Sequence, residues 1–308
     1  MLSHYHASFD VGDENNSHAV MLRMVGFNKR VLEAGCASGH VSEQLKAQGC
    51  QVVGVEIDPH VVEPALAWLE RVVIGDFEGG TVWPQLEGEL FDAVLFGDVL
   101  EHLKDPLTTL RESVTHLASS GVVVISIPNI AHADVKLALL NGTFPYSESG
   151  LLDRTHVSFF TKESLLQLVK EAGLAVVELC RVTAAVFHTE IEVPSDGVDG
   201  EVLAAVLADR ESETYQFVLK AVRDDGTHAL ATLSADVVEL TDRLHEASKR
   251  NEVLESEVLE LSLKVEALEI QRSCDAKDLE HYRRQTDAVK RLLPHSLVQL
   301  IRRGLGRT

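Results

Sequence analysis

The stretch from residue 30 to residue 58 constrains the fold of this 308-residue chain more than any other. It contains an apolar run, RVLEA, a group of small residues, GCASG, a polar segment, and a second apolar run, QVVGVE. Short apolar runs flanked by turn residues predict buried strands, and the polar segment between them predicts a helix. The stretch therefore predicts a β-α-β unit with a glycine-rich turn after the first strand and acids, Glu56 and Asp58, after the second.

The glycine-rich turn favours a nucleoside ligand. Gly35 and Gly39 allow the backbone to turn sharply and to approach a ligand closely. Glu56 follows about 20 residues later, where a carboxylate accepts hydrogen bonds from a ribose diol. The glycines alone are also compatible with an ordinary strand-to-helix turn. The order of strand, turn, helix and acid, taken together, predicts nucleoside binding.

The spacing of the small residues distinguishes between nucleoside cofactors. A dinucleotide site has the pattern G-x-G-x-x-G, whereas this chain has Glu33-Ala-Gly35-Cys-Ala37-Ser-Gly39. This pattern resembles motif I of the class I S-adenosylmethionine-dependent methyltransferases, (D/E)-x-G-x-G-x-G, with Ala37 in place of the middle glycine and slight crowding expected there. The resemblance covers roughly residues 20 to 223. It implies an S-adenosylmethionine site at Glu33, Gly35, Ala37, Gly39, Glu56, Asp76, Phe77 and Gly97.

Strands and helices alternate through the first 225 residues. Besides the two strands above, apolar runs predict strands over residues 71–76, 91–96, 121–127, 174–182 and 214–222. Helices are expected over residues 15–25, 40–48, 59–70, 105–117, 162–172 and 200–208. The alternation predicts an α/β fold with a doubly wound, mostly parallel seven-stranded sheet, Rossmann-like as in the methyltransferases. Ligands then bind at the carboxyl ends of the strands. There the resemblance implies that Asp76 and Phe77 meet the adenine, although Asp76 is also a plausible turn residue.

Three side chains that bind divalent cations follow the fourth strand, namely Asp98, Glu101 and His102. In a helical segment they stand at i, i+3 and i+4, which puts them on one face. Two carboxylates and an imidazole suit a cation such as Mg²⁺ or Mn²⁺. The segment resembles E-x-x-E-H in metal-dependent small-RNA 2′-O-methyltransferases and in ubiquinone-pathway O-methyltransferases, with the shorter Asp98 replacing the first glutamate. Without metal, Glu101 and His102 orient loops, serve as a base or are purely structural.

A histidine beyond the fifth strand supports the metal interpretation. After a turn-rich insertion at residues 141–150, the chain continues Asp153-Arg154-Thr-His156-Val-Ser-Phe-Phe-Thr161. His156 matches a histidine that, in the RNA methyltransferases, supplies a further metal ligand in a comparable context. The pattern also resembles O-methyltransferases of glycan and natural-product assembly. In the alternative interpretation, Thr161 caps a helix and the preceding residues anchor a loop. The insertion also carries three candidates for an acceptor pocket: Phe144, Tyr146 and Arg154.

Apolar residues recur every seven positions through residues 226–272, without proline or glycine between residues 230 and 268. Six such heptads predict a coiled coil. Valine at position a with leucine at position d favours a parallel two-stranded form, and the single Asn251 at an a position specifies register and strand number. A homodimer is therefore expected; the alternative is one long helix docked on its own domain. The a positions are Leu230, Val237, Leu244, Asn251, Val258 and Val265; the d positions are Leu233, Leu240, Ala247, Leu254, Leu261 and Leu268.

The last segment, residues 273–308, ends in a positively charged stretch. Residues 288–308 contain five cations and no acid, interleaved with apolar residues and interrupted by Pro294. A basic amphipathic segment is typical of a membrane-surface contact or of docking to a partner protein. The sequence thus predicts three parts: a methyltransferase domain at 1–225, a coiled coil at 226–272 and a basic amphipathic tail at 273–308.

Composition narrows the class of protein. The net charge of −20 disfavours a nucleic-acid partner, because binding phosphates requires clustered lysine and arginine. No run of 18 apolar residues predicts a membrane span, and the first ten residues lack a signal pattern. The four cysteines show neither metal nor disulfide spacing, which favours a reducing cytoplasm. We expect a cytoplasmic protein, with the tail as a route to peripheral membrane contact.

These patterns together predict an enzyme that transfers a methyl group from S-adenosylmethionine to a hydroxyl of a sugar, a glycan or a similar small polar acceptor. The expected catalytic residues are His102, His156 and Asp153. A metal at Asp98, Glu101, His102 and His156 would lower the pKa of the hydroxyl; without metal, His102 or His156 would be the base. The alternatives are an RNA or other 2′-O-type methyltransferase, and a non-catalytic scaffold that keeps the fold.

Overall fold

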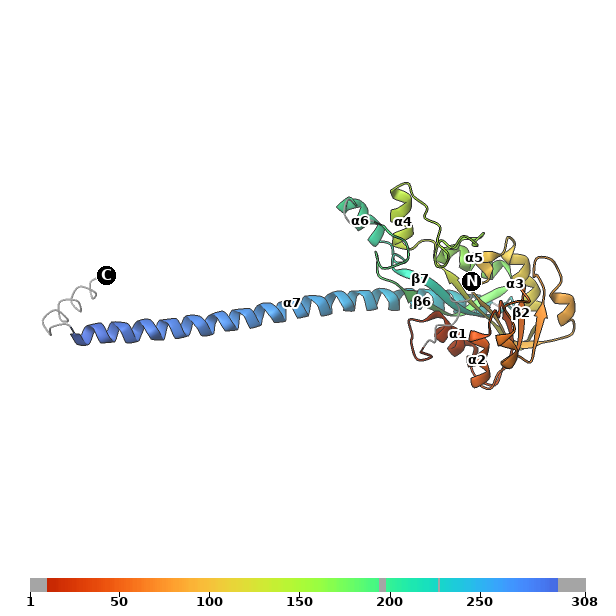
Figure 1. The fold of residues 1–308 in the computed structure, drawn as a ribbon, viewed down its shortest axis with the longest axis horizontal. Helices are drawn as coiled ribbons and strands as arrows, with labels where there is room; N and C mark the ends of the chain where they lie inside the picture. The colour runs from red at the N-terminus through yellow and green to blue at the C-terminus, as the bar shows by residue number, and fades with distance from the viewer. Residues whose placement is uncertain (1–9, 194–197, 227, 293–308) are drawn as a thin grey trace. The chain divides into compact units, whose positions relative to one another are not determined.

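The computed structural model describes residues 10–193, 198–226 and 228–292 (Figure 1). In this part of the chain, seven strands form one sheet in the order β3-β2-β1-β4-β5-β7-β6. The strands are β1 (Arg30–Ala34), β2 (Gln51–Glu56), β3 (Arg71–Ile74), β4 (Phe91–Gly97), β5 (Leu117–Pro128), β6 (Leu174–Thr183) and β7 (Thr214–Arg223). The α-helices are α1 (Ser17–Val25), α2 (His40–Ala47), α3 (Pro106–Thr115), α4 (Ala133–Leu140), α5 (Lys162–Glu171), α6 (Gly200–Leu207) and α7 (His228–Leu292).

The sheet is mixed, with one reversed strand. β1 to β5 pair in parallel, whereas β7 lies antiparallel between β5 and β6. This architecture confirms the predicted Rossmann-like fold. The strand order reverses between β1 and β4, so the connections that leave their carboxyl ends run to opposite sides. In open α/β sheets, that point forms the ligand-binding crevice.

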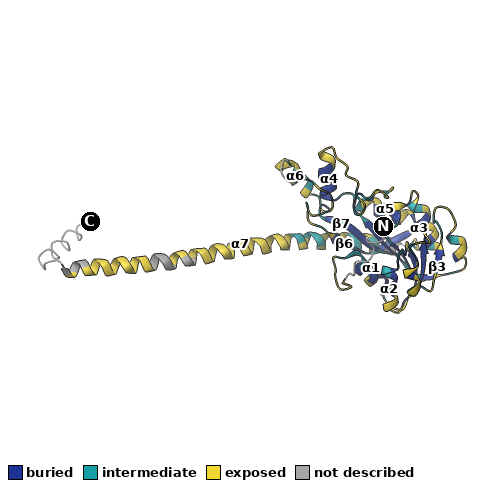
Figure 2. Ribbon diagram, in the orientation of Figure 1, coloured by how far each residue is buried: buried dark blue, intermediate teal, exposed yellow. Residues whose placement is uncertain are grey.

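The two faces of the sheet bury separate apolar layers, shown in dark blue in Figure 2. Neighbouring residues of one strand point to opposite faces, so Val52 packs with α1 and α2 while Val53 packs with α3 and α5. In Figure 1 these two helix pairs lie on opposite sides of the sheet. Coverage of both faces explains why the central strands are continuously apolar, as a parallel sheet requires.

The helix predicted over residues 59–70 is wrong. The segment contains turns and a single 3-10 helix, η1 (Pro64–Ala67). Pro64 lacks an amide hydrogen and its ring clashes with the preceding helical turn, so a helix cannot pass through it. The β-branched Val61 and Val62 further lower the helical propensity of the segment. The short connection matters for the site, because it brings Ala65 against the glycine loop.

Capping residues confirm several predicted helix starts. The side chain of Asn16 accepts a hydrogen bond from the Ala19 amide and caps α1, and Asp105 caps α3. Thr161 and Ser164 form a reciprocal capping box at the start of α5. Besides η1, three helices of the described residues have no counterpart in the prediction or differ in type: α4 lies in the insertion after β5, η2 (Trp83–Leu86) follows β3, and residues 100–102 form the 3-10 helix η3 (Leu100–His102).

The described residues divide into two compact units, the first ending at Arg243 and the second beginning at Leu244. Within the first unit, the first turns of α7 dock on the domain. Val238 packs against the core layer that contains α5, and Asp242 forms ion pairs with Lys162 and Arg181. No helix in the described ranges is both long enough and apolar enough to cross a membrane. Of the predicted basic tail, residues 273–292 form the end of α7, and residues 293–308 lie outside the described residues.

Candidate active site

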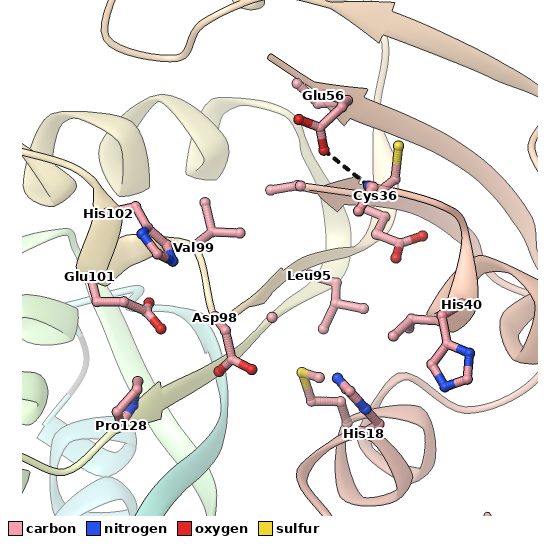
Figure 3. Close-up of a pocket in the computed structure, with 18 of the residues that line it drawn as sticks. His18, Cys36, His40, Glu56, Leu95, Asp98, Val99, Glu101, His102 and Pro128 are labelled. Carbon is pink, nitrogen blue, oxygen red and sulfur yellow. Dashed lines mark hydrogen bonds between the residues drawn. The ribbon is translucent and has the colours of Figure 1, made fainter. Parts of the chain in front are cut away.

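A cavity of about 1030 Å³ opens at the carboxyl ends of β1, β2 and β4 (Figure 3). Its volume is at the upper end of the range for ligand pockets, so a nucleoside cofactor and a second ligand fit together. The lining includes seven of the eight residues predicted to bind the cofactor: Glu33, Gly35, Ala37, Glu56, Asp76, Phe77 and Gly97. The eighth, Gly39, supports the loop from behind.

The glycine loop has the left-handed backbone that its sequence suggests. Gly35 and Gly39 have φ angles of 67° and 83°. A Cβ on Gly39 would lie 2.6 Å from the Cα of Ala65, so only glycine fits against η1. Ala37 also has a positive φ, 42°, which L-residues with a Cβ rarely adopt. The sequence suggested that the methyl group of Ala37 would crowd the loop. The structure shows instead that Ala37 strains the backbone.

Glu56 ties the end of β2 to the glycine loop. One carboxylate oxygen accepts a hydrogen bond from the Ala37 amide at 2.9 Å (dashed in Figure 3), and the other accepts from the amides of Ile57 and Asp58. A carboxylate has about four acceptor positions, so a position remains for a hydroxyl in the cavity. The same side chain thus shapes the loop and faces the predicted ribose position.

Glu33 is buried at the start of the loop and accepts a hydrogen bond from the Ser42 hydroxyl of α2. Burial raises its pKa to about 7, although the bond from Ser42 acts in the opposite direction. Glu33 therefore joins strand β1 to helix α2 across the loop, and its carboxyl group titrates near neutral pH.

At the end of β3, Asp76 and Phe77 occupy the positions expected for adenine contacts. Asp76 lines the cavity and also accepts a hydrogen bond from the Glu78 amide at 2.9 Å, as a turn residue does. Phe77 packs between Trp83 and Phe96, with ring centroids 5.2 and 6.2 Å away. Packing holds the Phe77 ring at the cavity wall, where a flat base can lie against it.

A second group of polar side chains lies across the cavity from the loop. Ligand atoms of Glu101, His102 and His156 lie within 4.8 Å of one another. Backbone bonds create this proximity: the amides of Val157 and Ser158 both donate to the Glu101 carbonyl at 2.9 Å. These bonds fasten the insertion after β5 to η3. They thereby bring His156 next to Glu101 and His102 of η3.

The electrostatics of this group depend on burial, which is greatest for Glu101, whereas His102 is exposed. Glu101 is 1% exposed, and neither of its carboxylate oxygens has a hydrogen-bond partner among the described residues. Burial, together with the nearby Asp98, raises its pKa well above the ordinary value. Burial and the neighbouring His102 lower the pKa of His156, so His156 is neutral at pH 7. An unpartnered buried carboxylate is costly, and a bound cation would remove that cost.

His102 has a defined tautomer. Its Nδ1 lies 3.2 Å from the carbonyl oxygen of Thr155, which can only accept, so Nδ1 carries the proton. Its Nε2 then has a free lone pair for a cation or for a proton of a substrate. The ring centroids of His102 and His156 are 4.9 Å apart.

Asp98, the fourth predicted ligand, is held apart from these three residues. It does not lie on a helical face with Glu101, because its φ is +55° and the 3-10 helix begins only at Leu100. Its carboxylate accepts hydrogen bonds from Ser126 and Gln216. Figure 3 shows Asp98 between the pair Glu101–His102 on one side and His18 on the other. Its short side chain thus serves to join β4 to the neighbouring strands.

The remaining predicted residues differ in their roles. Asp153 lines the cavity and accepts two hydrogen bonds from Thr155; burial acts to raise its pKa, but these bonds outweigh burial and lower it. Asp153 is thus an ionised anchor of the loop that carries His156. Arg154 pairs with exposed Glu148. Phe144, Tyr146 and Arg154 are absent from the cavity lining in the described part of the chain, contrary to the pocket prediction.

Several residues that line the cavity were not predicted, among them His18 and Gln216. His18 comes from α1 and lies near His40, with ring centroids 5.9 Å apart. Gln216 comes from β7 and contacts Asp98. His18 had a weak signal, because α1 precedes β1 where a helix can cover the cavity. Gln216 had none, since only the pairing of β7 with β5 brings it to Asp98.

This sheet order and glycine loop, with an acid at the end of β2, define a Rossmann-like S-adenosylmethionine-dependent methyltransferase of class I. A family model described as "Methyltransferase domain" matches residues 18–179, more than half of the chain. The chain belongs to this family, and the match includes every residue of the candidate site from His18 to His156.

Relatives with curated names support the same class. The ubiquinone biosynthesis O-methyltransferase of Cereibacter sphaeroides is 29% identical over 48% of this chain and 61% of its own length. That of Xanthomonas campestris is 34% identical over 37% of this chain and 49% of its own length. The chain thus spans about half to three fifths of these relatives. Among solved structures, a methyltransferase from Archaeoglobus fulgidus has 20% identity and a TM-score of 0.49, covering 68% of this chain and 94% of its own.

Proposed function

We propose that the protein methylates a hydroxyl group at the Glu101–His102–His156 cluster, with assistance from a divalent cation. S-adenosylmethionine supplies an electrophilic methyl group. The residues of the glycine loop, Glu56 and Phe77 hold its nucleoside on one side of the cavity. The cluster lies on the other side, so an acceptor hydroxyl placed there faces the methyl group. Catalysis then rests on alignment and on removal of the hydroxyl proton.

The observation that carries the cation proposal is the orphaned carboxylate of Glu101. Its two buried oxygens have no hydrogen-bond partner among the described residues, and it faces two imidazoles, one of which has a free Nε2. Oxygen and imidazole donors suit Mn²⁺ and Mg²⁺. A cation held by Glu101, His102 and His156 would supply the positive charge that lowers the pKa of the acceptor hydroxyl. Asp98 is not included in this set, because only Glu101, His102 and His156 have ligand atoms within 4.8 Å of one another, while Oδ1 of Asp98 accepts from Gln216 and Ser126.

A cation-free route is the second candidate. His102 is held by Thr155 with its Nε2 lone pair available, and the lowered pKa of His156 keeps that ring neutral. Either histidine then accepts the hydroxyl proton directly. The two routes differ in one measurable property, since only the first depends on added metal.

The acceptor proposal rests on the surroundings of His156. The Phe144 ring packs against the rings of Tyr146 and Phe159, and the Phe159 ring lies 6.2 Å from that of His156. These three rings are not part of the cavity lining but lie next to it, beside His156. All three are exposed. Aromatic faces of this kind accept the apolar face of a sugar or an aromatic ring. We propose a sugar or glycan hydroxyl as the acceptor. A phenolic hydroxyl is the second candidate, because the curated relatives are named for ubiquinone biosynthesis.

The test is transfer of labelled methyl from S-adenosylmethionine to sugars, glycans and simple phenols. Each reaction is run with Mn²⁺ or Mg²⁺ and again with EDTA. Transfer that stops in EDTA and returns with metal supports the cation route. Transfer that is indifferent to EDTA excludes the cation and supports a histidine base. The preferred acceptor class decides between sugar and phenol.

Absence of all transfer requires a separate measurement of cofactor binding. Titration with S-adenosylhomocysteine detects the cofactor site without any acceptor. If the protein binds this molecule but no acceptor is methylated, the panel lacks the right acceptor class. If it does not bind, the proposed function is wrong and the scaffold alternative stands.

A further inference from the structure

The exposed face of α7 is an extended apolar feature that the methyltransferase function does not use. In Figure 2 most of α7 is exposed, shown in yellow. Eight of its apolar residues at heptad positions a and d are more than half exposed, in contrast to the same residue types in the sheet, whereas Val237, also at an a position, is partly buried. The eight exposed residues are Leu233 (52%), Leu240 (59%), Leu244 (72%), Leu254 (52%), Val258 (62%), Leu261 (60%), Val265 (55%) and Leu268 (68%).

The docking of α7 on its own domain leaves this stripe uncovered. Val238 packs on the core and Asp242 pairs with Lys162 and Arg181. In the heptad assignment, Val238 is at b and Asp242 is at f, on the side of the helix away from a and d. In the same turns, Leu233 and Leu240 remain exposed. Within residues 228–243, the domain therefore contacts one side of the helix and leaves the d residues Leu233 and Leu240 exposed.

Charges beside the stripe identify that partner as a second copy of the same chain. In a parallel, in-register dimer, each g residue faces the e residue five positions further along in the partner helix. Between residues 243 and 283, three of these g–e' pairs have a charged residue at both positions, and in each pair the two charges have opposite signs. The pairs are Arg250 with Glu255, Lys264 with Glu269, and Asp278 with Arg283. No like-charged pair occurs in this span, so the sequence complements itself in this register.

Asn251 gives the same orientation by an independent argument. In a parallel dimer, a residues face a residues, so the two Asn251 side chains meet and can bond to each other. In an antiparallel dimer, a residues face d residues, which here are leucine or alanine in all six heptads. The amide would then be buried without a partner, at a cost. In the single chain, Asn251 donates to Glu255 at 2.8 Å.

We propose that residues 230–268 form a parallel, in-register, two-stranded coiled coil with a second copy of this chain. The apolar stripe supplies the buried seam, the g and e charges select the partner, and Asn251 sets the register. The proposal does not rest on the methyltransferase function, and its test requires no substrate.

The first test is the mass of the full chain by sedimentation equilibrium over a range of concentrations. We expect twice the chain mass of 33.8 kDa. R250E places a like charge against Glu255 of the second copy, twice per dimer, and should raise the dimer dissociation constant about tenfold. The double variant R250E/E255R reverses both charges and should restore the native value. A monomer at all concentrations, a trimer or larger assembly, or a double variant as weak as R250E would overturn the proposal.

A disulfide test decides the orientation. L254C places one cysteine at a d position, where the two copies meet in the parallel register. V253C is its matched control, because Val253 is at position c and is also exposed, at 58%. After mild oxidation, L254C should give a covalent dimer well above the background of the native cysteines, and V253C should not. Equal cross-linking of the two variants, or none by L254C in a dimeric protein, excludes the in-register parallel pairing.

Discussion

The Nε2 atom of His156 lies 4.0 Å from Oε1 of Glu101, although the two residues are far apart in the sequence. Both side chains are almost fully buried. The contact depends on two backbone bonds that fasten residues 157 and 158 to the Glu101 carbonyl. The insertion after β5 therefore completes a site that begins at the end of β4, and the first prediction concerns this pair.

Replacing Glu101 by glutamine should abolish cation binding with little change in fold. The amide keeps the shape of the side chain but removes the negative charge that a divalent cation requires. We expect at least about 100-fold weaker Mn²⁺ binding and a comparable loss of methyl transfer. Calorimetric titration with Mn²⁺ measures the first effect without any acceptor.

Glu148→Gln is the matched control for that variant, because Glu148 belongs to the same insertion but is exposed and, among the described residues, bonds only to Arg154. Its Mn²⁺ affinity should equal that of the native chain. Native affinity in Glu101→Gln would show that the orphaned carboxylate is not a ligand.

Replacing Gln216 by leucine should destabilise the domain. The Gln216 amide donates to both Asp98 and the Ser126 hydroxyl, and its loss leaves a buried carboxylate with fewer partners. A loss of about 1–3 kcal/mol in the free energy of unfolding is expected. Urea denaturation measures it.

Tyr215→Phe, one residue earlier on β7, serves as the comparison. It removes a single hydrogen bond to the exposed Glu190, so it should cost less than Gln216→Leu. Equal costs would mean that the bonds to Asp98 contribute nothing specific.

Replacing Glu33 by glutamine should change the pH dependence of stability. Burial raises the pKa of Glu33 from 4.5 to about 7. The folded state therefore holds a proton that the unfolded state loses, and stability falls as pH rises from about 4.5 to 7. This difference corresponds to roughly 3 kcal/mol. The glutamine side chain does not ionise, so the variant lacks this pH-dependent contribution to the free energy of unfolding.

The prediction for Glu33 is tested by urea denaturation of both proteins at pH 4.5 and pH 8. Relative to the native chain, Glu33→Gln should be more stable at pH 8 than at pH 4.5. A stability difference between variant and native that is equal at the two pH values would contradict the raised pKa.

Replacing Ala37 by glycine should be neutral or stabilising. Ala37 has a φ of 42°, and the left-handed conformation costs an L-residue about 1–2 kcal/mol. Glycine removes this cost. It also destabilises the folded state by about 0.4–1 kcal/mol, because the unfolded chain has more conformational freedom with glycine than with alanine. A net gain in the free energy of unfolding between 0 and about 1.6 kcal/mol follows. Thermal denaturation detects it.

Ala47→Gly provides the reference for an ordinary backbone, because Ala47 ends the helix α2. Glycine there should cost about 0.5–1 kcal/mol. If Ala37→Gly destabilises as much as Ala47→Gly, the loop carries no strain at Ala37.

Much of the fold was predictable because its signals are local. The apolar runs of β1, β2 and β5, the Asn16 and Thr161 caps and the glycine loop each depend on neighbouring residues. The predicted helix over residues 59–70 failed for a local reason as well: Pro64 outweighs the surrounding helix-compatible residues.

The sequence by itself determined the class of fold, the cofactor loop and the apolar repeat of α7, since strand and helix periods and turn residues act over a few positions. Only the tertiary structure decided which polar groups meet. The insertion brings His156 next to Glu101. Asp98 accepts a hydrogen bond from Gln216 and does not join the cluster of Glu101, His102 and His156. Such pairings depend on sheet order and on bonds between distant segments, where burial makes each unsatisfied group costly. No local pattern encodes them.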